Sequence, residues 1–125
     1  MQHVRGIGGV FFKAEDPKAL AAWYEKVLGI PLEKWGGAVF RWKDRAVPGA
    51  GTVWSPFKAD TSYFAPSDKP YMFNFVVEDL DAMLAQVREA GATVVGDVVS
   101  EDNGKFAWIV DPEGNKLELW EPREK

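Results

Sequence analysis

The residues that could do chemistry in this chain are few and widely spaced. Its 125 residues include one histidine, His3, and no cysteine. Disulfides, thiolate metal sites and cysteine nucleophiles are therefore absent, and one imidazole at the start of the chain does not supply a site built from several. The formal net charge of -4 disfavours a phosphate backbone as ligand, because such binding depends on clustered Lys and Arg. We expect no nucleic-acid partner.

Glu118 is a carboxylate inside an apolar, strand-like segment that runs from Leu117 to Trp120. Burying a carboxylate without a partner is costly, so it must face water, a donor such as Asn74 or Lys13, or a ligand. Out of water beside Trp120, it is a candidate general base. The alternative is a carboxylate that is hydrogen-bonded and chemically inert.

The pattern that must position Glu118 begins with a strand, a helix and three further strands. The apolar segment 9–14 leads into Glu15-Asp16-Pro17, an acidic cap with a proline in the first helical turn. Apolar residues recur at helical spacing over 18–28 and stop at Gly29. Strands are then expected over 32–35, 38–43 and 52–54, separated by turns rich in glycine and proline.

The same order begins again after a loop over 55–70. An apolar strand over 71–77 precedes a helix over 80–89, and strands are expected over 93–95, 105–110 and 116–120. Similar residues recur in the same order and at a nearly constant period. The matched pairs are Asp16 with Asp79, Asp44 with Asp111, and Trp54 with Trp120. The repeat indicates a duplicated module.

Two such modules, ending in Asp-Pro-Glu-Gly-Asn at 111–115 and then Leu-Glu-Leu, resemble the vicinal oxygen chelate superfamily of glyoxalases, bleomycin-resistance proteins and extradiol dioxygenases. The resemblance implies an α+β, glyoxalase-like fold in which two tandem βαβββ modules form curled mixed sheets around a shared cleft. One domain is expected over 1–125, with module one at about 6–56, a linker loop at 57–69 and module two at about 70–122. One chain or two could form the cleft.

Metal-dependent members of this superfamily carry up to four ligands on the first and last strands of the modules. The resemblance carries these positions to Gly9, Thr52, Met72 and Glu118. Glycine has no side chain, a thioether is a poor ligand for hard ions and a neutral hydroxyl is a weak one, so only Glu118 could coordinate. Because a catalytic zinc centre typically needs three protein ligands, we expect no metal and no cofactor.

The predicted cleft is aromatic. Residues two apart on a strand share a face, so Glu118 and Trp120 are expected to point into the cleft together, with their repeat equivalents opposite. The predicted ligand-binding residues are Phe11, Thr52, Trp54, Met72, Asn74 and Trp120. Such a lining suits a planar or amphipathic organic ligand. The aromatic loop over 55–64 either closes over the cleft as a lid or tucks its rings against the sheets.

Two functions fit these residues best. The first is a metal-independent small-molecule binding protein of the glyoxalase and bleomycin-resistance type. The alternative is a glyoxalase-related lyase, isomerase or transferase that uses Glu118 as general base or as a residual metal ligand; a module that binds another protein is a third. The expected partner is a small organic molecule, met in the cytoplasm and away from any membrane, and the resemblance implies a homodimer.

Overall fold

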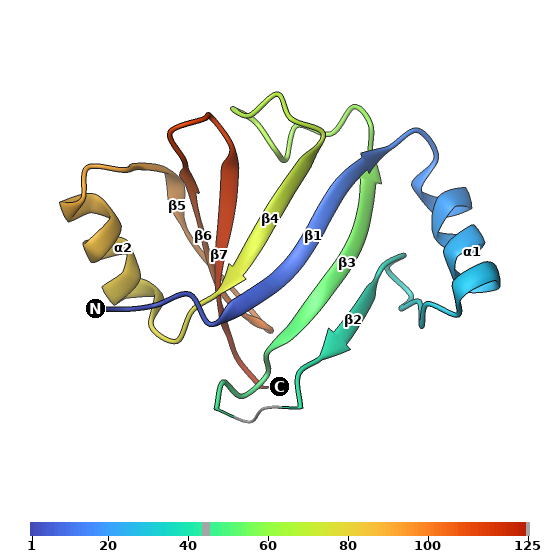
Figure 1. Cartoon of the computed structure of the whole chain (residues 1–125), viewed down its shortest axis with the longest axis horizontal. Helices are drawn as coiled ribbons and strands as arrows, with labels where there is room; N and C mark the ends of the chain where they lie inside the picture. Colours follow the sequence, from blue (N-terminus) through green and yellow to red (C-terminus); the bar gives the residue numbers. More distant parts are fainter. Residues whose placement is uncertain (44–45, 125) are drawn as a thin grey trace.

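The computed structural model describes residues 1–43 and 46–124, so Asp44, which entered the sequence repeat, lies outside the described residues. These described residues form two helices and seven strands (Figure 1). They are β1 (Gly6–Ala14), α1 (Pro17–Leu28), β2 (Ala38–Arg41), β3 (Gly51–Lys58), β4 (Tyr71–Val76), α2 (Leu80–Glu89), β5 (Thr93–Glu101), β6 (Gly104–Val110) and β7 (Lys116–Pro122). Neither helix of the described chain is long and apolar enough to cross a membrane.

Aspartate caps start both helices. The Asp16 carboxylate accepts a hydrogen bond from the backbone N–H of Ala19, and a proline occupies the first turn of α1. Gly29 ends α1 in the left-handed conformation, at φ 68°. Asp79 caps α2 through the backbone N–H of Ala82. The helix starts predicted from the sequence are therefore confirmed.

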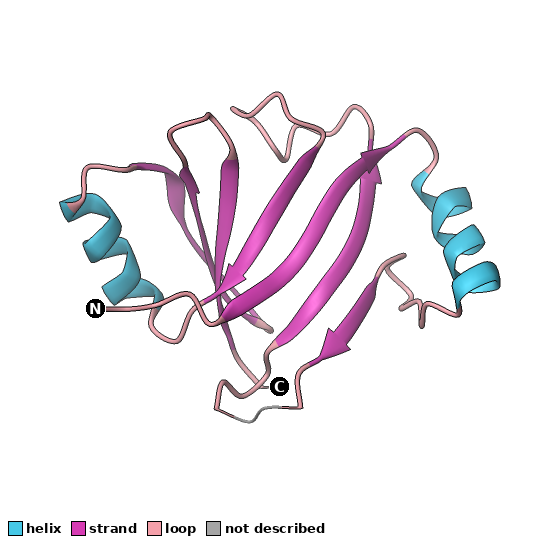
Figure 2. Ribbon diagram, in the orientation of Figure 1, coloured by secondary structure: helices cyan, strands magenta, loops and turns pink. Residues whose placement is uncertain are grey.

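All seven strands form one mixed sheet in the order β2-β3-β1-β4-β7-β6-β5. β1 pairs in parallel with β3, and β4 pairs in parallel with β7, so each module has the same kind of parallel pairing. An antiparallel pairing of β1 with β4 joins the modules edge to edge within one chain. The sheet is strongly twisted and does not close on itself (Figure 2). Strands of both modules therefore contribute to each face.

Module one differs from its expected order because residues 32–35 form no strand. The backbone N–H of Gly36 bonds the Glu33 carbonyl, and the N–H of Glu33 bonds the Gly37 carbonyl, which makes a turn instead. Gly36 has a φ of 99°, a conformation that glycine adopts without strain. Module one is therefore βαββ. Two strands are also longer than predicted: β3 continues to Lys58, through residues expected to be loop, and β5 continues to Glu101.

Both helices pack on the same face of the sheet, near its two ends in Figure 1. α2 buries three apolar residues, and Leu84 packs in one core cluster with Leu119 of β7. α1 is held more loosely, with only Ala21 buried and the ring of Tyr24 lying 4.8 Å from that of Trp54. Because Leu119 faces the helices, its neighbours along β7 face the other way. That opposite face forms the candidate site.

Candidate ligand-binding cleft

Three residues on neighbouring strands stand side by side at the centre of the sheet. Gly9 of β1 lies opposite Asn74 of β4, and Asn74 lies beside Glu118 of β7. On the other side, Gly9 lies beside Val53 of β3. Gly9 and Asn74 therefore occupy equivalent positions in the two modules, as do Val53 and Glu118. The separation along the sequence is the same for both pairs, which fixes the structural repeat at the site.

Trp54 does not face the cleft, and the prediction that it does is wrong. Its ring packs on the helix face, against Tyr24 of α1 at 4.8 Å and Phe12 of β1 at 5.6 Å between centroids. The prediction came from matching Trp54 to Trp120, whereas the strand register makes the residue after Trp54 the equivalent of Trp120. A slip of one residue along a strand turns every side chain to the other face. Val53 and Phe57 line the cleft instead.

Thr52 and Met72, also predicted to bind ligand, lie outside the cleft lining. The Thr52 hydroxyl donates to the Ile7 carbonyl at 2.6 Å and accepts from Trp42 Nε1 at 3.0 Å. The same one-residue slip in the repeat matched Thr52 to Glu118, whereas the neighbouring Val53 is the residue that faces the cleft. Met72 is 1% exposed and packs in a core cluster with Phe64. Both side chains are engaged by the protein itself.

Glu118 is 3% exposed and accepts hydrogen bonds from three donors. Asn74 Nδ2 donates to Oε1 at 2.6 Å. Tyr63 Oη and Trp108 Nε1 donate to Oε2 at 2.5 and 2.8 Å. Each carboxylate oxygen has two lone pairs, so Oε2 is fully used and Oε1 retains one. The buried carboxylate is therefore satisfied by the protein, as one of the two sequence alternatives expected.

Tyr63 is held in place as a neutral donor. Burial raises the pKa of its hydroxyl well above the usual range, and the charge of Glu118 acts in the same direction. Lys116 Nζ donates to the Tyr63 carbonyl at 2.6 Å and lies 5.1 Å from the centre of its ring. Burial also lowers the pKa of Lys116, and Glu118 opposes that change. The backbone, ring and hydroxyl of Tyr63 are therefore all engaged.

The loop between β3 and β4 packs its aromatic side chains on the cleft face. Phe64 is fully buried in a cluster with Phe11. The ring of Tyr63 stacks on Phe57, with 5.6 Å between centroids and 13° between planes. Figure 1 shows this loop beside the ends of β3 and β4. It fills one end of the cleft, in agreement with the tucked alternative, and leaves the other end open.

Two glycines of β1 make room at the cleft floor, which we define as Asn74 and Glu118 with the glycines beside them. A Cβ at Gly8 would lie 2.2 Å from Asn74 Oδ1, and one at Gly9 would lie 2.8 Å from the Phe11 ring. β1 therefore contributes no side chain here. Asn74 is 2% exposed, and its Oδ1 has no hydrogen-bond partner among the described residues.

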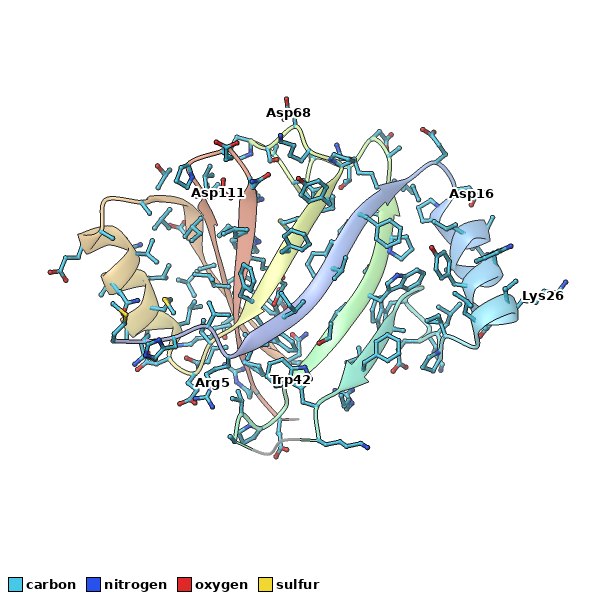
Figure 3. The ribbon with its side chains drawn as sticks, viewed as in Figure 1. Arg5, Asp16, Lys26, Trp42, Asp68 and Asp111 are labelled. Atoms are coloured by element: carbon cyan, nitrogen blue, oxygen red, sulfur yellow. The ribbon has the colours of Figure 1, made fainter. Side chains whose placement is uncertain are left out.

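The open part of the cleft has a volume of about 1290 Å³. Its wall includes Phe106, which stacks on Trp120 with 6.0 Å between centroids and 4° between planes. Trp120 Nε1 donates to the Asn103 carbonyl at 3.0 Å, so its polar edge is already bonded. Figure 3 labels Trp42 at this end of the sheet and Asp111 at the opposite end. Four of the predicted residues line the open part: Phe11, Asn74, Glu118 and Trp120.

Trp108 was not predicted as a partner of Glu118, and Tyr63 was expected only as part of an aromatic loop. Trp108 lies directly opposite Glu118 in the antiparallel pairing of β6 with β7. Extending the hairpin from its turn at 111–115 would have paired the two residues. No comparable signal places Tyr63, because a loop has no register.

Residues 9–120 match the family described as the glyoxalase-like domain. This match spans most of the chain, from the floor of the cleft on β1 to its aromatic wall on β7. The chain therefore belongs to the glyoxalase-like family. A search against curated proteins gave no significant match.

Solved structures with the same fold include two epimerases. Methylmalonyl-CoA epimerase from Mycobacterium tuberculosis is 22% identical, with a TM-score of 0.64 over 97% of this chain and 90% of that one. A variant of the Streptomyces coelicolor enzyme in complex with 2-nitronate-propionyl-CoA is 16% identical, with a TM-score of 0.68 over 98% and 100%. A glyoxalase/bleomycin resistance protein/dioxygenase superfamily member from Vibrio splendidus is 14% identical, with a TM-score of 0.58 over 96% and 98%. At these identities the likeness concerns the fold.

The residues at the centre of the sheet do not fit the metal centre of metal-dependent superfamily members. The register places Gly9, Val53, Asn74 and Glu118 at equivalent points of the two modules, and only one of these is a strong ligand for a divalent cation. Its carboxylate already accepts three hydrogen bonds. Among the described residues, no three His, Cys, Asp or Glu side chains gather closely enough to hold a metal ion.

Proposed function

We propose that this protein binds a planar or amphipathic organic ligand in the open part of its cleft without a resident metal and without transforming the ligand. The observation that carries the proposal is the state of Glu118. Three protein donors engage this carboxylate at the floor, while a large aromatic cavity stays open beside it. An aromatic lining beside a carboxylate that the protein itself holds supports binding over catalysis by Glu118.

The wall suits a ligand with an extended apolar face. Phe106 and Phe57 are half-buried and line the cavity, so their rings offer surface for stacking. Aromatic pairs contribute about 1 kcal/mol beyond the area they bury. The indole N–H groups of Trp42 and Trp120 are bonded to the protein, which fixes the orientation of both rings before a ligand enters. Pre-organisation of this kind reduces the entropic cost of binding.

Catalysis by Glu118 is the competing function. A general base must come within hydrogen-bond reach of the proton that it removes. Oε2 has both lone pairs occupied by Tyr63 and Trp108, and Oε1 accepts from Asn74. Base catalysis at Oε2 would therefore require the loss of a bond from Tyr63 or Trp108, and base catalysis at Oε1 would have to use the one lone pair that Asn74 leaves. Binding requires the loss of none of these bonds.

The neutral naphthalene dye prodan provides a direct test, because its fluorescence shifts to shorter wavelength in an apolar site. We expect saturable binding to the wild-type protein in chelator. Phe106→Ala, which removes a cleft ring, should weaken binding about tenfold. Phe12→Ala is the matched control, since Phe12 is also half-buried but contacts Trp54 on the helix face. Equal loss in both variants, or no saturable binding at all, would contradict the proposal.

A further inference from the structure

The cleft floor leaves hydrogen-bond acceptors unpaired, whereas each side-chain nitrogen nearby already donates to the protein. Asn74 Nδ2 and Trp108 Nε1 both donate to Glu118. Nearby, Trp120 Nε1 donates to the carbonyl of Asn103. Each of these nitrogen atoms therefore has an acceptor within the protein. Asn74 Nδ2 carries a second N–H, so a ligand group that itself accepts hydrogen bonds would find at most that one donor among these side-chain nitrogens.

Acceptor capacity, by contrast, is left over. Asn74 Oδ1 is buried and has no partner among the described residues, and Glu118 Oε1 accepts a single bond and retains a lone pair. A buried acceptor without a donor is unfavourable, so a donor delivered by a ligand would recover free energy that the protein alone does not. Both residues line the cavity.

The charge around the cavity points the same way. Among the described residues, five acidic side chains line the open part against three basic ones. The acidic residues are Glu33, Glu101, Asp102, Glu118 and Glu124, and the basic residues are Lys34, Arg41 and Arg123. Lys116 interacts electrostatically with Glu118 but lies outside this lining, with its Nζ bonded to the Tyr63 carbonyl. A cation in the cleft would therefore meet a net negative lining and the faces of aromatic rings.

We propose that the ligand is a planar aromatic or heteroaromatic cation whose inner end carries N–H donors, as in an amidinium or a protonated aminoheterocycle. The N–H groups bond Glu118 Oε1 and Asn74 Oδ1, directly or through one water, and the ring lies against the Phe106 and Trp120 wall. This inference rests on the proposed function and adds the polarity of the ligand to it. Carboxylates and other anions are disfavoured at the floor.

Three small probes of similar shape separate these polarities: benzamidinium has N–H donors and a positive charge, acetophenone is neutral and only accepts, and benzoate is an anion. Each is titrated against bound prodan on the wild-type protein. We expect benzamidinium to displace prodan at a concentration at least about tenfold lower than either other probe. Equal or better displacement by benzoate or acetophenone would overturn the inference. Failure of benzamidinium to displace prodan at its solubility limit would overturn it as well.

A charge-neutralising variant tests whether Glu118 causes the preference for benzamidinium. Glu118→Gln should reduce the advantage of benzamidinium at least about fivefold while prodan still binds. Glu113→Gln removes the same charge from an exposed turn outside the cleft and should leave the ranking unchanged. If Glu118→Gln retains the full preference, the floor assignment is wrong; if this variant does not fold, the wild-type ranking remains the deciding result. Saturable prodan binding without any preference overturns only this inference, whereas absent prodan binding overturns the proposed function too.

Discussion

Tyr63 and Glu118 lie 55 residues apart in the chain and are joined by a hydrogen bond of 2.5 Å from the phenol to the carboxylate. The bond connects the loop between β3 and β4 to the centre of β7. It satisfies one face of a buried carboxylate and fixes the loop over one end of the cleft. The bond acts together with the buried Phe64 ring and the Lys116 bond to the Tyr63 carbonyl, which hold the same loop.

Replacing Tyr63 with phenylalanine should lower the free energy of unfolding by about 2 kcal/mol, because a hydrogen bond to a buried charged group is lost. Urea denaturation measures this change. Tyr71→Phe is the matched control, since Tyr71 is similarly exposed, at 39% against 38%, but its ring lies against Phe73 on the strand β4. Equal effects of the two substitutions would contradict a special role for Tyr63.

At alkaline pH, most of the difference in unfolding free energy between wild type and Tyr63→Phe should disappear. The pKa of Tyr63 is raised in the folded protein from its ordinary value of 10.0 by burial and by Glu118. The stabilisation is therefore present below about pH 10 and is lost as the pH rises, since the unfolded chain releases the proton first. Above about pH 10, the unfolding free energy of wild type should fall relative to Tyr63→Phe by about 1.4 kcal/mol per pH unit. A difference that stays constant up to about pH 11 would show that the phenol is not protected.

The contribution of Asp111, in the turn between β6 and β7, to the stability of the protein should be lost in acid. The Asn115 side chain and backbone N–H groups donate to its carboxylate, which lowers the pKa of Asp111 below its ordinary value of 3.8. Its contribution is therefore present above about pH 4 and is lost as the pH falls through the lower folded value. Asp111→Ala should destabilise the protein at neutral pH and have less effect near about pH 2, whereas Asp68→Ala, in an exposed loop, serves as the control. An effect of Asp111→Ala that is independent of pH would refute the carboxylate's role.

The homodimer implied by the sequence resemblance stays a prediction, and α1 is where we expect it to form. Trp23 and Val27 are 53% and 54% exposed and lie one turn apart on the helix. Trp23→Glu should convert a dimer to a monomer in sedimentation equilibrium, and Val98→Glu, on β5, should not. A monomeric wild type at about 100 µM would contradict the assignment.

The sequence carried enough information to predict the overall architecture but not the lining of the whole cleft. Helix starts are local, so Asp16 and Asp79 predicted them correctly. Which face a strand residue occupies depends on register, and matching Trp54 to Trp120 by residue type placed Trp54 on the wrong face. Module one also has no strand over 32–35, because the turn that Gly36 and Gly37 close begins at Glu33, inside the segment expected to be a strand. Each error involved a choice that tertiary pairing decides.

The surroundings of Glu118 were also only partly predictable from the sequence. Its cost of burial was readable from Leu117 and Leu119, and Asn74 was a foreseeable donor because it lies on a neighbouring strand. The bond from Tyr63 was not foreseeable, since it depends on how a loop with no repeating pattern folds back over the sheet. Loops follow tertiary contacts more than local preference.

The most direct test of a metal-free binding cleft is nitrogen–proton correlation NMR of the six tryptophan side chains during a prodan titration in chelator. We expect the indole signals of Trp42 and Trp120 to shift in a saturable way while that of Trp54 on the helix face stays in place. We also expect that adding Mn²⁺, Ni²⁺ or Zn²⁺ in place of chelator leaves the prodan affinity unchanged. Shifts confined to Trp54, or binding that begins only when a metal is added, would contradict it.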